Sequence, residues 1–121
     1  MAARRAGHSL GRFVTAAEQA HGVSLADLSP IDQLEVRTRN TLYRITLVDG
    51  REGRVLVQGG AFFPVQAEAR LSGGSLGGSL LKQGWIGCGF CMEIHHRGQR
   101  IVTTGVREIR RLGERSLPGP H

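Results

Sequence analysis

The chain has 121 residues, which is enough for one domain with a hydrophobic core but not for two. Its net charge of +6 is carried by arginine, because Lys82 is the only lysine. No apolar run approaches the roughly 18–20 residues of a membrane span, and the charged N-terminus lacks the hydrophobic segment of a secretory signal. We therefore expect a cytoplasmic protein with reduced cysteines and no membrane partner.

The first expected element is a helix over residues 10–21, preceded by a basic and disordered N-terminus at 1–8. Ser9 is a suitable N-cap and Gly22 a suitable C-terminal stop. Between them, a mostly apolar set recurs at helical spacing on one face: Leu10, Phe13, Val14, Ala17 and His21. Three turns are marginal in isolation, so this stripe must dock on the barrel or on a second subunit. Residues 23–30 could add a single helical turn before Pro30.

From residue 34 the apolar period becomes two, which is typical of strands. Residues 34–47 form two strands or one bent strand, 49–53 form a hairpin turn, and 54–58 form the returning strand. Phe62 and Phe63 suit a corner where both rings are buried, and 65–71 is either strand or helix. A Gly-Gly-Ser-Leu repeat follows at 73–80 and predicts a flexible hairpin loop or a strand with glycine bulges.

The C-terminal part predicts a long strand at 81–95, a turn at 97–99 and a strand at 100–104. A last short strand or turn of helix follows at 106–112, and then a disordered tail at 113–121. Eighteen glycines among short apolar runs favour an all-β chain. The expected fold is a small barrel or sandwich of six to seven short antiparallel strands with one N-terminal helix. It forms a single β-rich domain over residues 9–112, with strands from about 33 to 110.

The segment 80–96 contains most of the residues that could form a binding or catalytic site. Strict alternation places one apolar face at Ile86, Cys88, Phe90, Met92 and Ile94. The opposite face is mixed and is our candidate ligand or interface face: Trp85, Gly87, Gly89, Cys91, Glu93 and His95. The two glycines leave a shallow trough beside Trp85, against which the protein's own helix, a neighbouring subunit or a flat ligand could pack.

Cysteine and histidine in the same segment raise two alternatives. Cys88, Cys91, His95 and His96 are the residue types of a two-cysteine, two-histidine zinc site. Cys88 and Cys91 are three apart, however, so on a regular strand they project from opposite faces. Cys91, Glu93 and His95 share a face, so they could bind a metal or act as a thiol or acid–base site. The favoured interpretation has no metal, no cofactor and no catalytic residue, with Cys88 in the core.

The arginines are a candidate surface for non-specific nucleic-acid binding, through phosphate contacts. The residues concerned are Arg37, Arg39, Arg44, Arg51, Arg54, Arg107, Arg110 and Arg111. Glu35 shares a strand face with Arg37 and Arg39, so that face carries both signs of charge. The chain has only six aromatic residues, which leaves few side chains for base stacking.

The sequence as a whole favours a non-enzymatic binding or assembly protein, which self-associates through the helix and the Trp85–His95 face. The two alternatives are a nucleic-acid-binding module that uses the arginines, and a small metal- or thiol-dependent enzyme centred on Cys91, Glu93 and His95. The sequence does not identify a small-molecule ligand.

Overall fold

A computed structural model describes residues 9–112, so the two ends expected to be disordered, 1–8 and 113–121, lie outside the described residues. The elements in chain order are α2 (Leu10–Gln19), β1 (Gly22–Ser24), the 3₁₀ helix η1 (Leu25–Asp27), β2 (Gln33–Thr38), β3 (Leu42–Asp49), β4 (Arg54–Gly59), β5 (Phe63–Ser75), β6 (Leu81–Gln83), β7 (Trp85–Gly87), β8 (Cys91–His96) and β9 (Gln99–Leu112). The all-β fold with one helix is confirmed.

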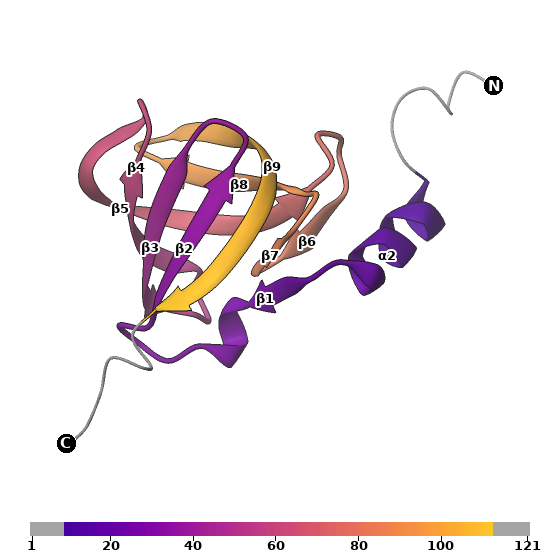
Figure 1. Cartoon of the computed structure of the whole chain (residues 1–121), viewed down its shortest axis with the longest axis horizontal. Helices are drawn as coiled ribbons and strands as arrows, with labels where there is room; N and C mark the ends of the chain where they lie inside the picture. The colour runs from indigo at the N-terminus through magenta and orange to yellow at the C-terminus, as the bar shows by residue number, and fades with distance from the viewer. Residues whose placement is uncertain (1–8, 113–121) are drawn as a thin grey trace.

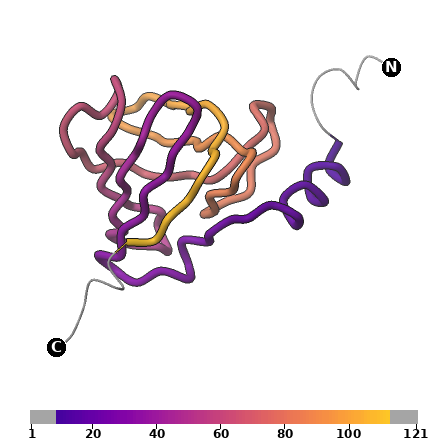
Figure 2. The backbone as a smooth tube through the Cα atoms, in the orientation of Figure 1, coloured from indigo at the N-terminus to yellow at the C-terminus, as the bar shows by residue number. Residues whose placement is uncertain are grey.

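The main sheet closes into a barrel (Figures 1 and 2). Its strands lie in the order β4-β3-β2-β9-β8-β5-β6, and β5 also pairs with β4, so the hydrogen bonds form a ring. Neighbouring strands are antiparallel throughout. The short strand β6 extends this sheet beside the end of β5, while β1 and β7 form a separate two-stranded sheet. Closure removes the exposed edges that an open sheet would present.

The barrel interior is filled by the inward residues of alternating strands. In β2, β3 and β4 every second side chain is buried, as the period of two predicts. These strands supply Leu34, Val36, Tyr43, Ile45, Leu47, Val55 and Val57 to the core, and β8 and β9 add Met92, Ile94, Ile101, Val106 and Ile109. We call this set the barrel core.

Two segments that the sequence left open are now defined. Residues 39–41 connect β2 to β3 as a hairpin, so 34–47 contains two strands. Residues 65–71 are strand, inside β5, because the segment pairs with β4, and its last two residues, Arg70 and Leu71, pair also with β8. The predicted hairpin at 49–53 is confirmed, with Asp49 Oδ1 accepting from the backbone N–H of Arg51 at 3.0 Å.

Other boundaries differ from the sequence predictions for simple geometric reasons. Phe63 is buried, but Phe62 is 58% exposed, so the expectation that both rings are buried is wrong. The two strands expected on either side of Gly105 are one strand, β9, whose register against β8 shifts by a bulge at this point. The first Gly-Gly-Ser of the repeat ends β5, and the second lies in the loop before β6.

The N-terminal helix begins as expected and ends slightly early. Ser9 Oγ accepts from the backbone N–H of Arg12 at 3.2 Å, and Ala20 is already extended, so α2 stops at Gln19. Gly22 then belongs to β1, and η1 supplies the single turn expected before Pro30. Figure 1 shows α2 projecting from one side of the barrel. Within residues 9–112, no helix combines the length and apolarity needed to cross a membrane.

Candidate functional site

The segment 80–96 is not the single strand that its alternation predicts. It is divided into β6, β7 and β8, and Gly84 and Gly89 stand at the two breaks with φ of 60° and 89°. Glycine adopts this left-handed backbone at little cost, which lets the chain turn where the sequence pattern alone reads as continuous. Phe90 N–H donates to the carbonyl of Gly87 at 3.0 Å and closes the second turn. The predicted six-residue face is therefore wrong as one continuous surface.

Trp85 lies inside the molecule rather than on an open face, with 5% of its surface exposed. It packs edge-to-face against Phe90, with ring centroids 4.9 Å apart, and Phe90 packs in the same way against Phe13 of α2 at 5.6 Å. Ala17 completes the group. We call these four residues the Trp85 cluster. The helix of the same chain covers this face, which was one of the three partners that the sequence left open.

The trough predicted beside Trp85 is filled by the indole itself. A Cβ placed on Gly22 or Gly87 would overlap the indole atoms, and one on Gly74 would lie 3.1 Å from Trp85 Cε3. Three glycines from β1, β5 and β7 thus form the bare surface on which the ring lies. Lys82 Nζ stands 4.7 Å from the ring centroid, a cation–π distance. Gly89 is exposed in the turn before β8 and contributes nothing to this surface.

Glu93 is the buried polar residue of β8, and its partner is Arg100. The guanidinium donates two hydrogen bonds to the carboxylate, Nε to Oε1 at 3.1 Å and Nη2 to Oε2 at 3.0 Å. Burial acts to raise the pKa of Glu93, but hydrogen bonds from Ser75 and Arg100 and the charges of Arg100 and His95 outweigh it and hold the pKa below its usual value. This carboxylate is an ionised, ion-paired group.

The same arrangement acts against a thiolate at Cys91. Burial raises the pKa of the Cys91 thiol, and the negative charge of Glu93 raises it further. Burial likewise raises the pKa of Cys88, together with the charge of Glu108, and Cys88 packs against the barrel core. Within residues 9–112, no three His, Cys, Asp or Glu side chains are grouped as a metal site would need, so the described structure does not bring Cys91, Glu93 and His95 together as ligands.

The predicted arginine surface is a network of mixed charge. Glu35 lies between Arg44 and Arg110, with N–O distances of 3.4 and 2.8 Å, and the hydrogen bond from Arg110 lowers its pKa. Three further predicted arginines have carboxylate partners, in the pairs Arg37–Glu108, Arg54–Glu68 and Arg111–Asp32. Within the described residues, Arg39, Arg51 and Arg107 are the members of the predicted set without an ion pair. Few of these guanidinium groups are left for a phosphate backbone.

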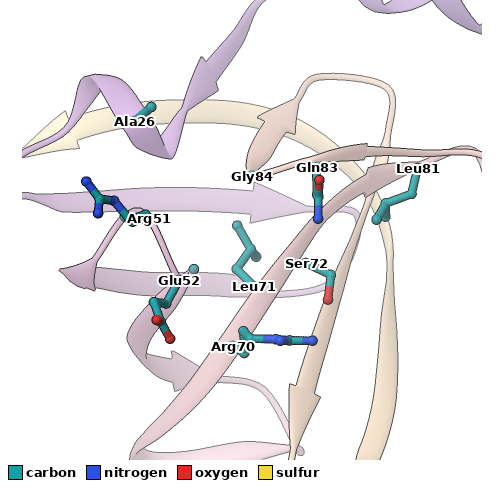
Figure 3. Close-up of a pocket in the computed structure, with 11 residues that line it drawn as sticks. Ala26, Arg51, Glu52, Arg70, Leu71, Ser72, Leu81, Gln83 and Gly84 are labelled. Carbon is teal, nitrogen blue, oxygen red and sulfur yellow. The ribbon is translucent and has the colours of Figure 1, made fainter.

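A cavity that the sequence did not indicate lies at the end of the barrel that carries the β3–β4 turn (Figure 3). Its volume is about 670 Å³, and its walls come from η1, the β3–β4 turn, the middle of β5 and the end of β6. The polar and charged lining residues are Arg51, Glu52, Arg70, Ser72 and Gln83.

Close backbone packing shapes this end of the barrel. A Cβ on Gly50 would lie 2.8 Å from the Leu25 carbonyl oxygen, and one on Gly53 would lie 2.7 Å from that of Leu71. The glycine-rich sequence at 49–53 predicts a turn. It does not predict that the turn packs against η1 and β5, because that contact depends on the tertiary fold.

Comparison with known proteins adds nothing to these observations: no family model, no curated protein and no solved structure matches the chain.

Proposed function

We propose that the protein is a non-enzymatic β-barrel module that works by binding and assembly, and that it self-associates through α2. The observation that carries the proposal is the division of the helix's apolar stripe. Phe13 and Ala17 are buried in the Trp85 cluster, whereas Leu10 is 64% exposed and Val14 is 43% exposed. Leu10 and Val14 are four residues apart, so they lie on one face of the helix.

A second copy of α2 is the proposed occupant of that face. Gly11 lies beside Leu10 and Val14 on the exposed side of the helix, and a Cβ at this position would have no neighbour within 4 Å. A bare position next to two apolar side chains allows another helix to approach closely. In a symmetric dimer the same surface is used on both copies, so each buried pair of side chains is gained twice.

The chemistry of β8 supports a binding role over a catalytic one. Cys91, the only nucleophile in the predicted catalytic set, has a raised thiol pKa, and Glu93 is held by Arg100 in a bidentate ion pair. A general base must be free to take up a proton, and a nucleophilic cysteine must be deprotonated. Neither condition is met in this arrangement.

The test is the mass of the full chain measured by size-exclusion chromatography with light scattering. We expect a dimer for the unaltered protein and a monomer for the double substitution of Leu10→Glu with Val14→Glu. Each apolar side chain contributes about 1–2 kcal/mol when buried, so the dimer should weaken by more than about a hundredfold.

The control is Val65→Glu, which introduces a glutamate at an apolar residue of β5 that is 70% exposed. This variant should remain a dimer. A monomer for the unaltered protein across micromolar concentrations would contradict the proposal, as would a dimer that survives both glutamates on α2.

A further inference from the structure

We propose that the cavity beside the β3–β4 turn binds a small phosphorylated polyol, a compound of the sugar phosphate class, with Arg70 as the main contact of the phosphate group. The proposal does not depend on self-association, because the lining residues come from η1, the barrel and β6 rather than from α2.

Arg70 faces another arginine across the sheet and has no ion-pair partner among the described residues, although the carboxylate of Glu52 lines the same cavity. On β5 it is the cross-strand partner of Arg54 on one side and of His95 on the other. Arg54 is paired with Glu68 at 3.5 Å, but within residues 9–112 no ion pair includes Arg70. Like charges directly opposite each other on neighbouring strands are unfavourable. An anion beside Arg70 would relieve this repulsion.

Ser72 supplies a second, independent sign of a missing partner. Its Oγ is buried and has no hydrogen-bond partner among the described residues, although buried hydroxyl groups are nearly always satisfied. Ser72 stands at a shift in the β5–β8 register, between Leu71 and Gly73, and bulges of this kind re-aim side chains near binding sites. Because the Oγ is buried as it stands, the proposal requires a change of χ1 to another staggered rotamer when the ligand binds.

Gln83 brings a third donor to the same part of the cavity. It is the cross-strand partner of Gly73, and the N–H of the next residue, Gly84, donates to the Ser72 carbonyl at 2.9 Å. In the view of Figure 3, the Ser72 hydroxyl lies between the Gln83 amide and the end of Arg70. A planar carboxylate is satisfied by one bidentate arginine. Donors from three separate residues suit a tetrahedral oxyanion, which points to phosphate.

The rest of the cavity suits the carbon skeleton of a polyol. Arg51 and Glu52 lie on the other side of Leu71 from Ser72 in Figure 3, and they offer hydrogen bonds of both signs to hydroxyl groups. None of the described residues that line the cavity is aromatic, so a nucleobase would find no ring on which to stack. The volume of about 670 Å³ falls in the range of small-molecule sites.

The experiment titrates the full chain with ribose 5-phosphate, ribose and inorganic phosphate, and follows backbone amide shifts by NMR. We expect ribose 5-phosphate to shift the amides of 50–53, 70–72 and 83–84 with a dissociation constant of about 1 mM or tighter. Ribose and inorganic phosphate should each bind at least about tenfold more weakly, because each lacks half of the recognised groups.

Two variants and a control separate the proposed contacts from general charge. Arg70→Gln should weaken binding by about tenfold or more. Arg39→Gln, which removes the same charge in the β2–β3 turn at the opposite end of the barrel, should not weaken it. Ser72→Ala removes the unsatisfied hydroxyl, so it should raise the melting temperature while weakening binding. If the Ser72 hydroxyl does not contact the ligand, the substitution will leave binding unchanged.

Four results would overturn the proposal. These are no amide shifts with ribose 5-phosphate at about 10 mM, equal weakening by Arg39→Gln and Arg70→Gln, unchanged binding in Ser72→Ala, and inorganic phosphate that binds as tightly as the sugar phosphate.

Discussion

The barrel core and the Trp85 cluster are both apolar and buried, but they are held in different ways. The barrel core lies inside a closed ring of antiparallel strands, and Val36, Val55 and Ile94 have no exposed surface. The Trp85 cluster lies outside that ring, where a ten-residue helix contributes Phe13 and Ala17, and three glycines form the surface under the indole.

The helix can open without the barrel, but the barrel strands cannot open one at a time. A closed ring loses pairing on both sides of a strand when any strand leaves, so it opens only in a concerted step. A helix of ten residues that docks through Phe13, Ala17 and the half-buried Ala16 is close to its stability limit alone, and it can detach while the barrel stays intact. Local openings of this kind are the ones expected at assembly surfaces.

The largest effect should follow from a cavity in the barrel core. Ile94→Ala removes a side chain with no exposed surface from the middle of β8. We expect the free energy of unfolding to fall by about 3 kcal/mol, from lost burial and the cavity left behind. Urea denaturation followed by far-ultraviolet circular dichroism measures it. Val65→Ala, at a residue 70% exposed, should change the value by no more than about 0.5 kcal/mol; a loss below about 1 kcal/mol in Ile94→Ala would show a loosely packed core.

A smaller effect should follow from filling the glycine surface under the indole. A Cβ on Gly87 would overlap the Trp85 ring, so Gly87→Ala must displace the ring or the backbone of β7. Overpacking of this kind costs about 2 kcal/mol. Because Trp85 is the only tryptophan, its fluorescence reports the displacement directly as a red shift.

Gly78→Ala is the matched control for this substitution. A Cβ at Gly78 would have no neighbour within 4 Å. The emission maximum should therefore not shift, and the free energy of unfolding should stay within about 0.5 kcal/mol of that of the unaltered protein. An unshifted spectrum in Gly87→Ala would mean that the indole is not held against β7.

The two regions also differ in how far they could be predicted from sequence. The barrel core follows from local alternation, and the inward residues Leu34, Ile45 and Val57 were recognisable from it. Over 80–96 the same rule held only in part: Ile86, Met92 and Ile94 are buried with the barrel core, as alternation predicts. Phe90 instead joins the Trp85 cluster, and the strand is broken at Gly84 and Gly89, which take positive φ. A glycine permits this conformation without requiring it, so only the tertiary packing of Trp85 and Phe90 reveals it.

Charge pairing and the cavity escaped prediction for a related reason. Glu35 and Arg110 are 75 positions apart, and β2 and β9 bring them to 2.8 Å. The cavity likewise assembles Ser72 with residues of η1 and the β3–β4 turn. Both depend on strand register, which is set by the whole barrel. Arginines that have no acidic neighbour in the sequence can therefore be ion-paired in the fold, as five of the eight predicted surface arginines are.

Phe13→Ala should have the smallest effect on stability, because the loss has an upper limit. Removing the ring detaches α2 from Trp85 and Phe90. Once the helix has left, no further loss is possible, so barrel stability should fall by about 1 kcal/mol, less than for Ile94→Ala. Hydrogen exchange followed by NMR should show α2 amides, among them the Phe13 N–H bonded to the Ser9 carbonyl, losing protection while β2 and β3 keep theirs. Thr15→Ala, at an exposed position of the same helix outside the proposed self-association face, should leave both sets protected, since alanine is the better helix former. Equal loss of protection in α2 and in the barrel strands would mean that the two regions unfold as one unit.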